Sequence, residues 1–259
     1  MIYHLYVMVI ESIYFADCVE AQSRWPVPGV KNLPTWPAGL STPMQARCSQ
    51  TKTKILEYYN FAESTFVRPW QDYKTGFINN PDATRSNYFI GLDKLHNITS
   101  TRSHSLSLAV ESKINSGFPE TKYKFEYNYI HVANEQEQYK ITLGELLKVT
   151  CLSKLNTEAC LTDQDYLLSE SQSYDPLLGI RGMKFSTNDM DNDASTTRHC
   201  SEEMGGVGWW FNDCAPCTNN ATDIEPYFGN IHRLCLPQMM FMSCPHAYCN
   251  SVSIEIRIM

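Results

Sequence analysis

Ten cysteines are distributed along this chain of 259 residues. The number is even and exceeds what a cytosolic enzyme usually carries, so these residues are expected to pair as disulfides in an oxidising compartment. Two glycosylation sequons, which begin at Asn97 and Asn220, point to the same compartment. The sequence therefore predicts a secreted, extracellular glycoprotein that disulfides hold together.

Charge and composition exclude several classes of protein. The net charge is -7 and no run of basic residues is present, which argues against a nucleic-acid partner because phosphate binding needs clustered Lys and Arg. No uninterrupted apolar run approaches the ~20 residues of a membrane helix, so we expect no membrane span. A hydrophobic content of 43% is enough for the core of one large domain or two small ones.

Residues 1–16 (MIYHLYVMVIESIYFA) have some features of a signal peptide. A short apolar run ends at Ile10, and the small residue Ala16 stands at the end of the segment. The segment has no Lys or Arg, however, and Glu11 interrupts its apolar part. Two interpretations of this segment are left open. It is a weak signal peptide, or it is an exon fragment or the result of a wrongly chosen start Met.

Hydrophobic patterning predicts short helices in the first half of the chain. Aromatic spacing in residues 66–77 (FVRPWQDYKTGF) suits a short helix that packs Trp70 and Tyr73. Gly76 is expected to end this helix in the left-handed conformation. Asp93 is expected to cap the next helix.

Alternating apolar residues predict strands in the middle of the chain, at residues 106–110, 123–129 and 139–143. Their close spacing suits an antiparallel meander. Residues 25–43 are rich in Pro and Gly and are expected to form turns. From Pro176 onward loops dominate until a last strand at residues 253–258. The predicted fold class is α+β, with a loop-rich C-terminal third.

The segment from residue 184 to residue 211 (KFSTNDMDNDASTTRHCSEEMGGVGWWF) carries three carboxylates at alternate positions, Asp189, Asp191 and Asp193. Like charges this close repel one another unless a cation or solvent separates them, and oxygen ligands of this kind suit Ca²⁺. A polar turn is the alternative. An EF-hand is excluded, because the sixth and twelfth positions from Asp189 hold Ala194 and Cys200 instead of Gly and Glu.

Five segments together resemble the fibrinogen-related domain, the C-terminal domain of fibrinogen chains, ficolins, tachylectins, angiopoietins and tenascins. They occur in the family's order, at residues 66–77, 88–99, 123–144, 184–193 and 208–214. The resemblance implies a central antiparallel sheet, short helices and a disulfide-braced calcium subdomain. It further implies one domain, at residues 17–259. Its expected parts are an N-terminal subdomain (17–57), a central sheet (58–175) and a calcium and recognition subdomain (176–259) whose last strand returns to the sheet.

The resemblance also implies disulfide pairs. Cys18 is expected to pair with Cys48, and Cys200 with Cys214. A local bridge between Cys151 and Cys160 is the simplest arrangement for that pair, which has no counterpart in the family. Two further bridges are expected among four cysteines in any of three connectivities, namely Cys217, Cys235, Cys244 and Cys249.

The family's calcium site maps onto the acidic segment. By resemblance, Asp191 and Asp193 supply carboxylate ligands to Ca²⁺, and the carbonyls of Ser195 and Thr197 complete the set. Asp189 becomes an outer-shell or surface charge. The sequence departs from the pattern here, since the interval from Asp193 to the next Cys is one residue longer than usual and Thr197 stands where Gly is common.

The recognition pocket of family lectins lies beside this loop. By resemblance it would be formed around Asp213, Cys214 and Ala215, with Tyr227 and Tyr248 as candidate stacking aromatics. Core packing is the alternative role for each aromatic. Many family members have His where this chain has Ala215. A glycan on Asn220 would partly cover the pocket. The tryptophans at 209 and 210 are expected in the core.

These expectations favour a secreted, calcium-dependent, lectin-like recognition module that binds glycans or acetylated groups in innate immunity. The alternative is a protein-binding or matrix-interaction module of the angiopoietin type that binds no sugar. No enzyme is expected, because HExxH and GxSxG motifs are absent and His199 is interpreted as a surface residue. The CxxC formed by Cys214 and Cys217 could also be a redox dithiol or part of a zinc site, but disulfides are favoured. Oligomeric state is left open.

Overall fold

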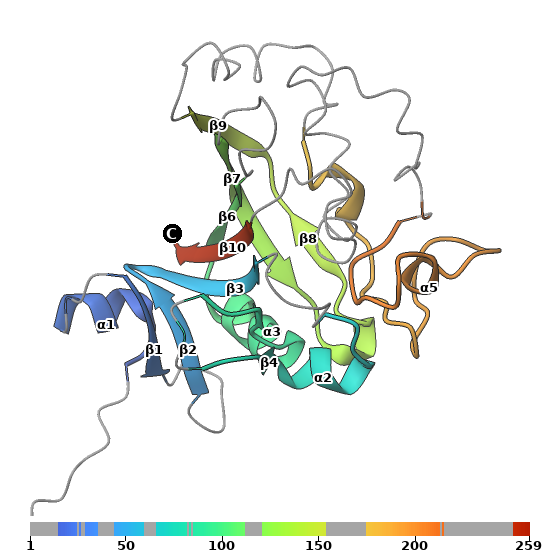
Figure 1. Ribbon diagram of the computed structural model, residues 1–259, viewed down its shortest axis with the longest axis horizontal. Coiled ribbons are helices and arrows are strands. Elements are labelled where there is room, and N and C mark those ends of the chain that lie inside the picture. The colour runs from blue at the N-terminus through green and yellow to red at the C-terminus, as the bar shows by residue number, and fades with distance from the viewer. Residues whose placement is uncertain are drawn as a thin grey trace, which may run out of the picture.

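The fold of this computed structural model is an antiparallel sheet flanked by short helices (Figure 1). The structure describes residues 15–24, 26, 29–35, 44–59, 66–81, 83, 85–111, 121–153, 175–212, 214 and 251–259. In Figure 1, α1 (Cys18–Arg24) lies beside the first two strands at one end of the view, and α5 (Cys200–Glu203) lies at the other. The α+β fold class expected from the sequence is confirmed.

The main path of the sheet contains seven strands in the order β1, β2, β3, β10, β6, β7, β8. Their bounds are β1 Val30–Thr35, β2 Met44–Ser49, β3 Lys52–Tyr59, β10 Ser251–Ile258, β6 His104–Glu111, β7 Thr121–Val132 and β8 Ile141–Leu143. Outside this path, β9 (Leu146–Ser153) pairs with β7, and β4 (Phe77–Ile78) pairs with β5 (Tyr88–Phe89). Strand β10 lies between β3 and β6 and is antiparallel to both. The N-terminal strands and this C-terminal strand therefore belong to one sheet.

The helices α2 (Trp70–Thr75) and α3 (Leu92–Thr101) form near the predicted places, with ends that differ in detail. Gly76 follows α2, but its φ of 90° and ψ of 159° are not left-handed helical. Asp93 lies inside the first turn of α3 and makes no capping bond; the N-cap is Gly91. Its carboxylate instead accepts a hydrogen bond from the Tyr139 hydroxyl at 2.5 Å. None of the described helices combines the length and apolarity needed to cross a bilayer.

An aromatic core joins α2 to the acidic segment. The ring of Tyr73 lies 5.1 Å from that of Phe185, and Phe185 lies 4.9 Å from Trp210 in an edge-to-face arrangement. The Tyr73 hydroxyl donates to the Phe66 carbonyl at 2.6 Å and accepts from the Gly208 N–H at 3.1 Å. Burial raises the pKa of this phenol far above its ordinary value, so it stays a neutral donor. The acidic segment is therefore attached to the aromatic core of the domain.

A second buried feature is a network of charges across β2, β3 and β10. Glu57 is fully buried and pairs with Arg47 and with Lys54, the latter at 3.0 Å. Lys54 also contacts Glu255 at 2.9 Å. Burial disfavours both charges of that pair, yet mutual attraction outweighs it and leaves the lysine pKa raised and the Glu255 pKa lowered. The network therefore stabilises the fold at neutral pH and loses this contribution as pH falls through the lowered pKa or rises through the raised one.

Candidate functional site

The acidic segment is held in place by a β-bridge between Ser186, which precedes the aspartates, and Trp209, which follows them. Ser186 and Trp209 exchange two backbone hydrogen bonds, of 2.9 and 3.0 Å. Trp209 and Trp210 are each only 3% exposed, and the Trp210 indole donates to the Tyr139 carbonyl at 2.8 Å. Both tryptophans therefore belong to the core, as expected, and fix the loop on the domain.

Asp189 links the loop to α2. Its Oδ1 accepts hydrogen bonds from the Trp70 backbone N–H at 2.9 Å and from the Thr187 hydroxyl at 2.7 Å. Trp70 is the first residue of α2, and the preceding Pro69 supplies no side-chain cap. A carboxylate at this position satisfies an otherwise unpaired N–H and interacts favourably with the helix dipole. Asp189 is exposed, as a surface charge would be, and it also caps α2 from a distant part of the chain.

One variant distinguishes the capping role of Asp189 from the calcium-binding role proposed for Asp191 and Asp193. We expect Asp189→Ala to lower the free energy of unfolding by about 1 kcal/mol, the usual cost of a lost cap. Any response of the protein to calcium should persist in this variant, because the side chain faces α2. Urea unfolding with and without calcium measures both quantities. Loss of the calcium response together with unchanged stability would show that Asp189 is a ligand and not a cap.

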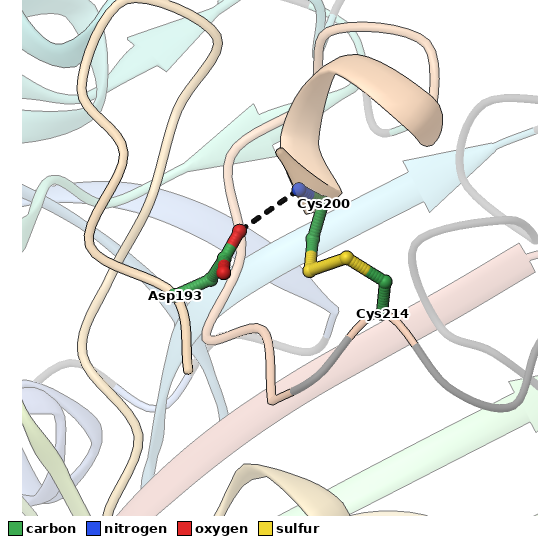
Figure 2. Close-up of side chains that lie close together, drawn as sticks. All are labelled: Asp193, Cys200 and Cys214. Atoms are coloured by element: carbon green, nitrogen blue, oxygen red, sulfur yellow. Dashed lines mark hydrogen bonds between the residues drawn. A yellow bond between two sulfur atoms is a disulfide. The ribbon is translucent and has the colours of Figure 1, made fainter. Parts of the chain in front are cut away.

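Asp193 is oriented by the backbone on both of its oxygens. Its Oδ1 accepts from the Ser195 N–H at 2.8 Å, and its Oδ2 accepts from the Cys200 N–H at 2.8 Å. Cys200 begins α5 and forms a disulfide with Cys214, so the carboxylate, the helix and the disulfide make one unit (Figure 2). Each oxygen keeps a second lone pair for another partner.

Asp191 lies next to this unit and is exposed. Ligand atoms of Asp191, Asp193 and His199 all lie within 4.8 Å of one another. Burial raises the pKa of Asp193, and the nearby Asp191 carboxylate raises it further, against the lowering effect of the two backbone N–H groups. Two carboxylates in this position repel each other unless a proton or a cation lies between them.

The two carboxylates of this loop lie close enough to share a calcium ion. Calcium takes oxygen ligands at about 2.3–2.6 Å, so two oxygens on one ion lie up to about 5 Å apart. The Asp191 and Asp193 carboxylates meet that limit. Among the described residues no backbone hydrogen bond ends on the carbonyl of Ser195 or Thr197. Asp191 and Asp193 could therefore share one ion, and the Ser195 and Thr197 carbonyls stay predicted ligands.

His199, expected as a surface residue, has a structural role that was not predicted. It is the N-cap of α5, and its Nδ1 accepts from the Glu202 N–H at 3.2 Å. Glu202 and Glu203 in the first turn of α5 are a typical helix-start pattern that could have indicated this cap. The cap holds the imidazole beside the carboxylates and fixes the start of the helix that orients Asp193.

Both disulfides implied by the resemblance are formed, Cys18–Cys48 and Cys200–Cys214. Cys214 has a positive φ of 47°. Several other predictions lie outside the described residues and stay predictions. They concern Asp213, Ala215, Asn220, Tyr227, Tyr248 and the cysteines 160, 217, 235, 244 and 249. Cys151 lies in β9 opposite Tyr123, and its bridge to Cys160 is equally untested.

The first sequon lies in α3. The Asn97 side-chain amide donates to the Asp93 carbonyl at 2.8 Å, and the buried Thr99 hydroxyl donates to the Leu95 carbonyl at 2.9 Å. Both side chains of the sequon are therefore bonded to the helix backbone in the folded domain. Glycosylation of Asn97 stays a prediction.

Residues 55–230 match the family model of the C-terminal globular domain of fibrinogen beta and gamma chains. The chain belongs to this family. Among similar fibrinogen-like proteins, Ryncolin-4 of Cerberus rynchops is 28% identical over 149 residues, which are 58% of this chain and 34% of that protein. Bovine (Bos taurus) fibroleukin is 29% identical over 166 residues, 64% of this chain and 31% of its own length. The matched part thus spans about a third of these relatives.

Solved fibrinogen-like structures share the fold. The fibrinogen-like globe domain of human ANGPTL6 has a TM-score of 0.59 at 20% identity, covering 97% of this chain and 99% of that domain. Lamprey fibrin D-dimer, complexed with the peptide ligand Gly-His-Arg-Pro-amide, has a TM-score of 0.63 at 17% identity, covering 96% of this chain and 74% of that one. At these identities the likeness establishes the architecture of a fibrinogen-like domain.

Proposed function

We propose that this fibrinogen-like domain is a secreted, calcium-dependent recognition module, lectin-like, that binds glycans or acetylated groups on cell or microbial surfaces. The observation that carries the proposal is the approach of the Asp191 and Asp193 carboxylates on a loop that a disulfide and a helix cap hold in place. Family membership supports a role in binding. The disulfides support an extracellular location.

Backbone hydrogen bonds to Asp193 would orient the acidic loop for calcium binding. The Cys200 and Ser195 N–H groups hold the Asp193 carboxylate in a fixed orientation. The exposed Asp191 carboxylate lies within 4.8 Å of it. Calcium, when bound, neutralises the repulsion between the two carboxylates and ties the loop to α5. The segment that follows Cys214 would then start from a fixed position, which is what a preformed recognition surface requires.

A protein-binding module is the second candidate function. The lamprey fibrin D-dimer, of the same fold, is complexed with a short peptide, and angiopoietin-4 of Mus musculus matches 77% of this chain at 22% identity. The sequence at Ala215 departs from the His of many family members, which removes one argument for sugar binding. A fibrinogen-like domain can therefore be proposed to bind an extracellular protein through the same loops.

Binding measurements with calcium and with EDTA distinguish the two functions. If the lectin proposal holds, the purified domain binds acetylated glycans on an array in calcium and loses this binding on chelation. The variant Asp191→Ala should lose the same binding, and Asp189→Ala should keep it. If the domain bound no glycan on the array and captured a matrix protein in a pull-down, the second function would be favoured.

A further inference from the structure

A cavity of about 170 Å³ lies between α1, the end of α3 and one part of the sheet. It is lined by the start of α1, by β1, β2 and β3, by the end of α3, and by β6 and β10, and it is partly open to solvent. Its apolar wall includes Ala46, Ile98, Ile256 and Ile258. The acidic loop contributes no residue to it, so the cavity is separate from the calcium site.

His104 is the polar group that distinguishes this cavity from an apolar void. Its side chain lines the cavity although the residue is only 4% exposed. Its Nδ1 lies 2.8 Å from the Arg102 carbonyl oxygen. A carbonyl can only accept, so Nδ1 carries the proton and Nε2 presents a lone pair. No described residue donates a hydrogen bond to that Nε2.

Several other polar side chains of the cavity already have hydrogen-bond or ion-pair partners. The hydroxyls of Thr35, Thr53 and Thr101 donate to the Met44 carbonyl, the Cys18 sulfur and the Ile98 carbonyl respectively. The Asp17 carboxylate accepts from two N–H groups at the start of α1 and pairs with Arg102 at 3.3 Å.

The cavity therefore offers an apolar wall together with Nε2 of His104 as a hydrogen-bond acceptor. His104 Nε2 is not among the described buried polar atoms that lack a partner, so solvent reaches it. An apolar ligand that displaces this solvent leaves the acceptor unpaired, whereas a donor on the ligand replaces it. Burial also lowers the pKa of His104, which keeps the ring neutral at physiological pH and leaves Nε2 an acceptor.

The volume limits the ligand to about one ring. An apolar cavity of about 150 Å³ is known to hold benzene, so the present space suits one six-membered ring with a small substituent. We propose that this cavity binds a small neutral molecule of that size that carries one hydroxyl or N–H group. The ring packs against the isoleucines, and the hydroxyl or N–H donates to Nε2 of His104.

Phenol and toluene test this proposal, since they have the same shape and differ in the donor. In the disulfide-intact domain, phenol should shift the His104 ring resonances in an NMR titration, with a dissociation constant on the order of 1 mM for so small a ligand. Toluene should bind roughly tenfold more weakly, because it cannot pair with Nε2.

Two variants assign the binding to this cavity. Ala46→Leu adds carbons to the cavity wall and should abolish phenol binding, and Asp191→Ala, in the distant loop, should leave it unchanged. Failure of phenol to shift His104 in the wild-type domain would overturn the proposal, even if Ala46→Leu did not fold. Equal affinity for phenol and toluene would overturn the role of His104, and unchanged binding in folded Ala46→Leu would place the ligand elsewhere.

Discussion

Replacement of Glu57 by glutamine is expected to lower the free energy of unfolding by about 3–5 kcal/mol, the usual cost of removing one partner from a buried ion pair. Glu57 is fully buried, and its partners Arg47 and Lys54 have side chains only 2% and 8% exposed. The variant leaves two buried cations with less compensating charge. Water cannot replace the lost carboxylate at this depth.

Urea unfolding of the wild-type and Glu57→Gln domains measures this cost. The matched control is Glu126→Gln, which removes a partly exposed partner of Lys124 and should cost at most about 1 kcal/mol. A Glu57→Gln domain as stable as the control would contradict the expected cost of leaving Arg47 and Lys54 without this buried partner.

The second large effect is expected from the disulfide beside the acidic loop. Replacing both Cys200 and Cys214 by serine removes a bridge between residues 14 apart. For a loop of that length the chain-entropy model predicts a loss of about 3 kcal/mol. Because the Cys200 N–H also orients Asp193, any calcium response should weaken in the same variant.

Thermal unfolding of the double serine variant beside the wild-type protein tests this expectation. Treatment of the wild-type domain with a reductant should reproduce part of the loss. A variant with wild-type stability and a full calcium response would contradict the bracing role assigned to the disulfide.

The sequence predicted the parts of the fold that depend on local pattern. Alternating apolar residues in β6 and β7 gave the correct strands, and the apolar Trp pair was correctly expected in the core. The order of the five matching segments indicated the family, which the match at residues 55–230 confirms. The subdivision into three parts stays a prediction.

Elements stabilised mainly by distant contacts were missed. Residues 30–35 were expected as turns because of their Pro and Gly neighbours, yet they form β1, an edge strand that tolerates Pro34. Asp93 was expected as a cap, but its partner Tyr139 lies 46 residues away. No local pattern could reveal these pairs.

In the candidate site, too, the local features were predicted and the contacts between distant residues were not. The carboxylates of Asp191 and Asp193 were expected together, and the structure places them within 4.8 Å. The partner of Asp189 lies 119 residues earlier in the chain, and the buried charge network depends on the register of three strands. Charged residues in strands are ordinarily exposed, so their burial needed the sheet topology to be known.

The most direct test of calcium binding at Asp191 and Asp193 is thermal unfolding in calcium and in EDTA. We expect calcium to stabilise the wild-type domain, by about 2.7 kcal/mol when the free ion is at 100 times its dissociation constant. The double variant Asp191→Ala with Asp193→Ala should melt at one temperature in both conditions, while Asp189→Ala should keep the shift. A wild-type domain that melts identically in calcium and in EDTA would contradict the calcium site.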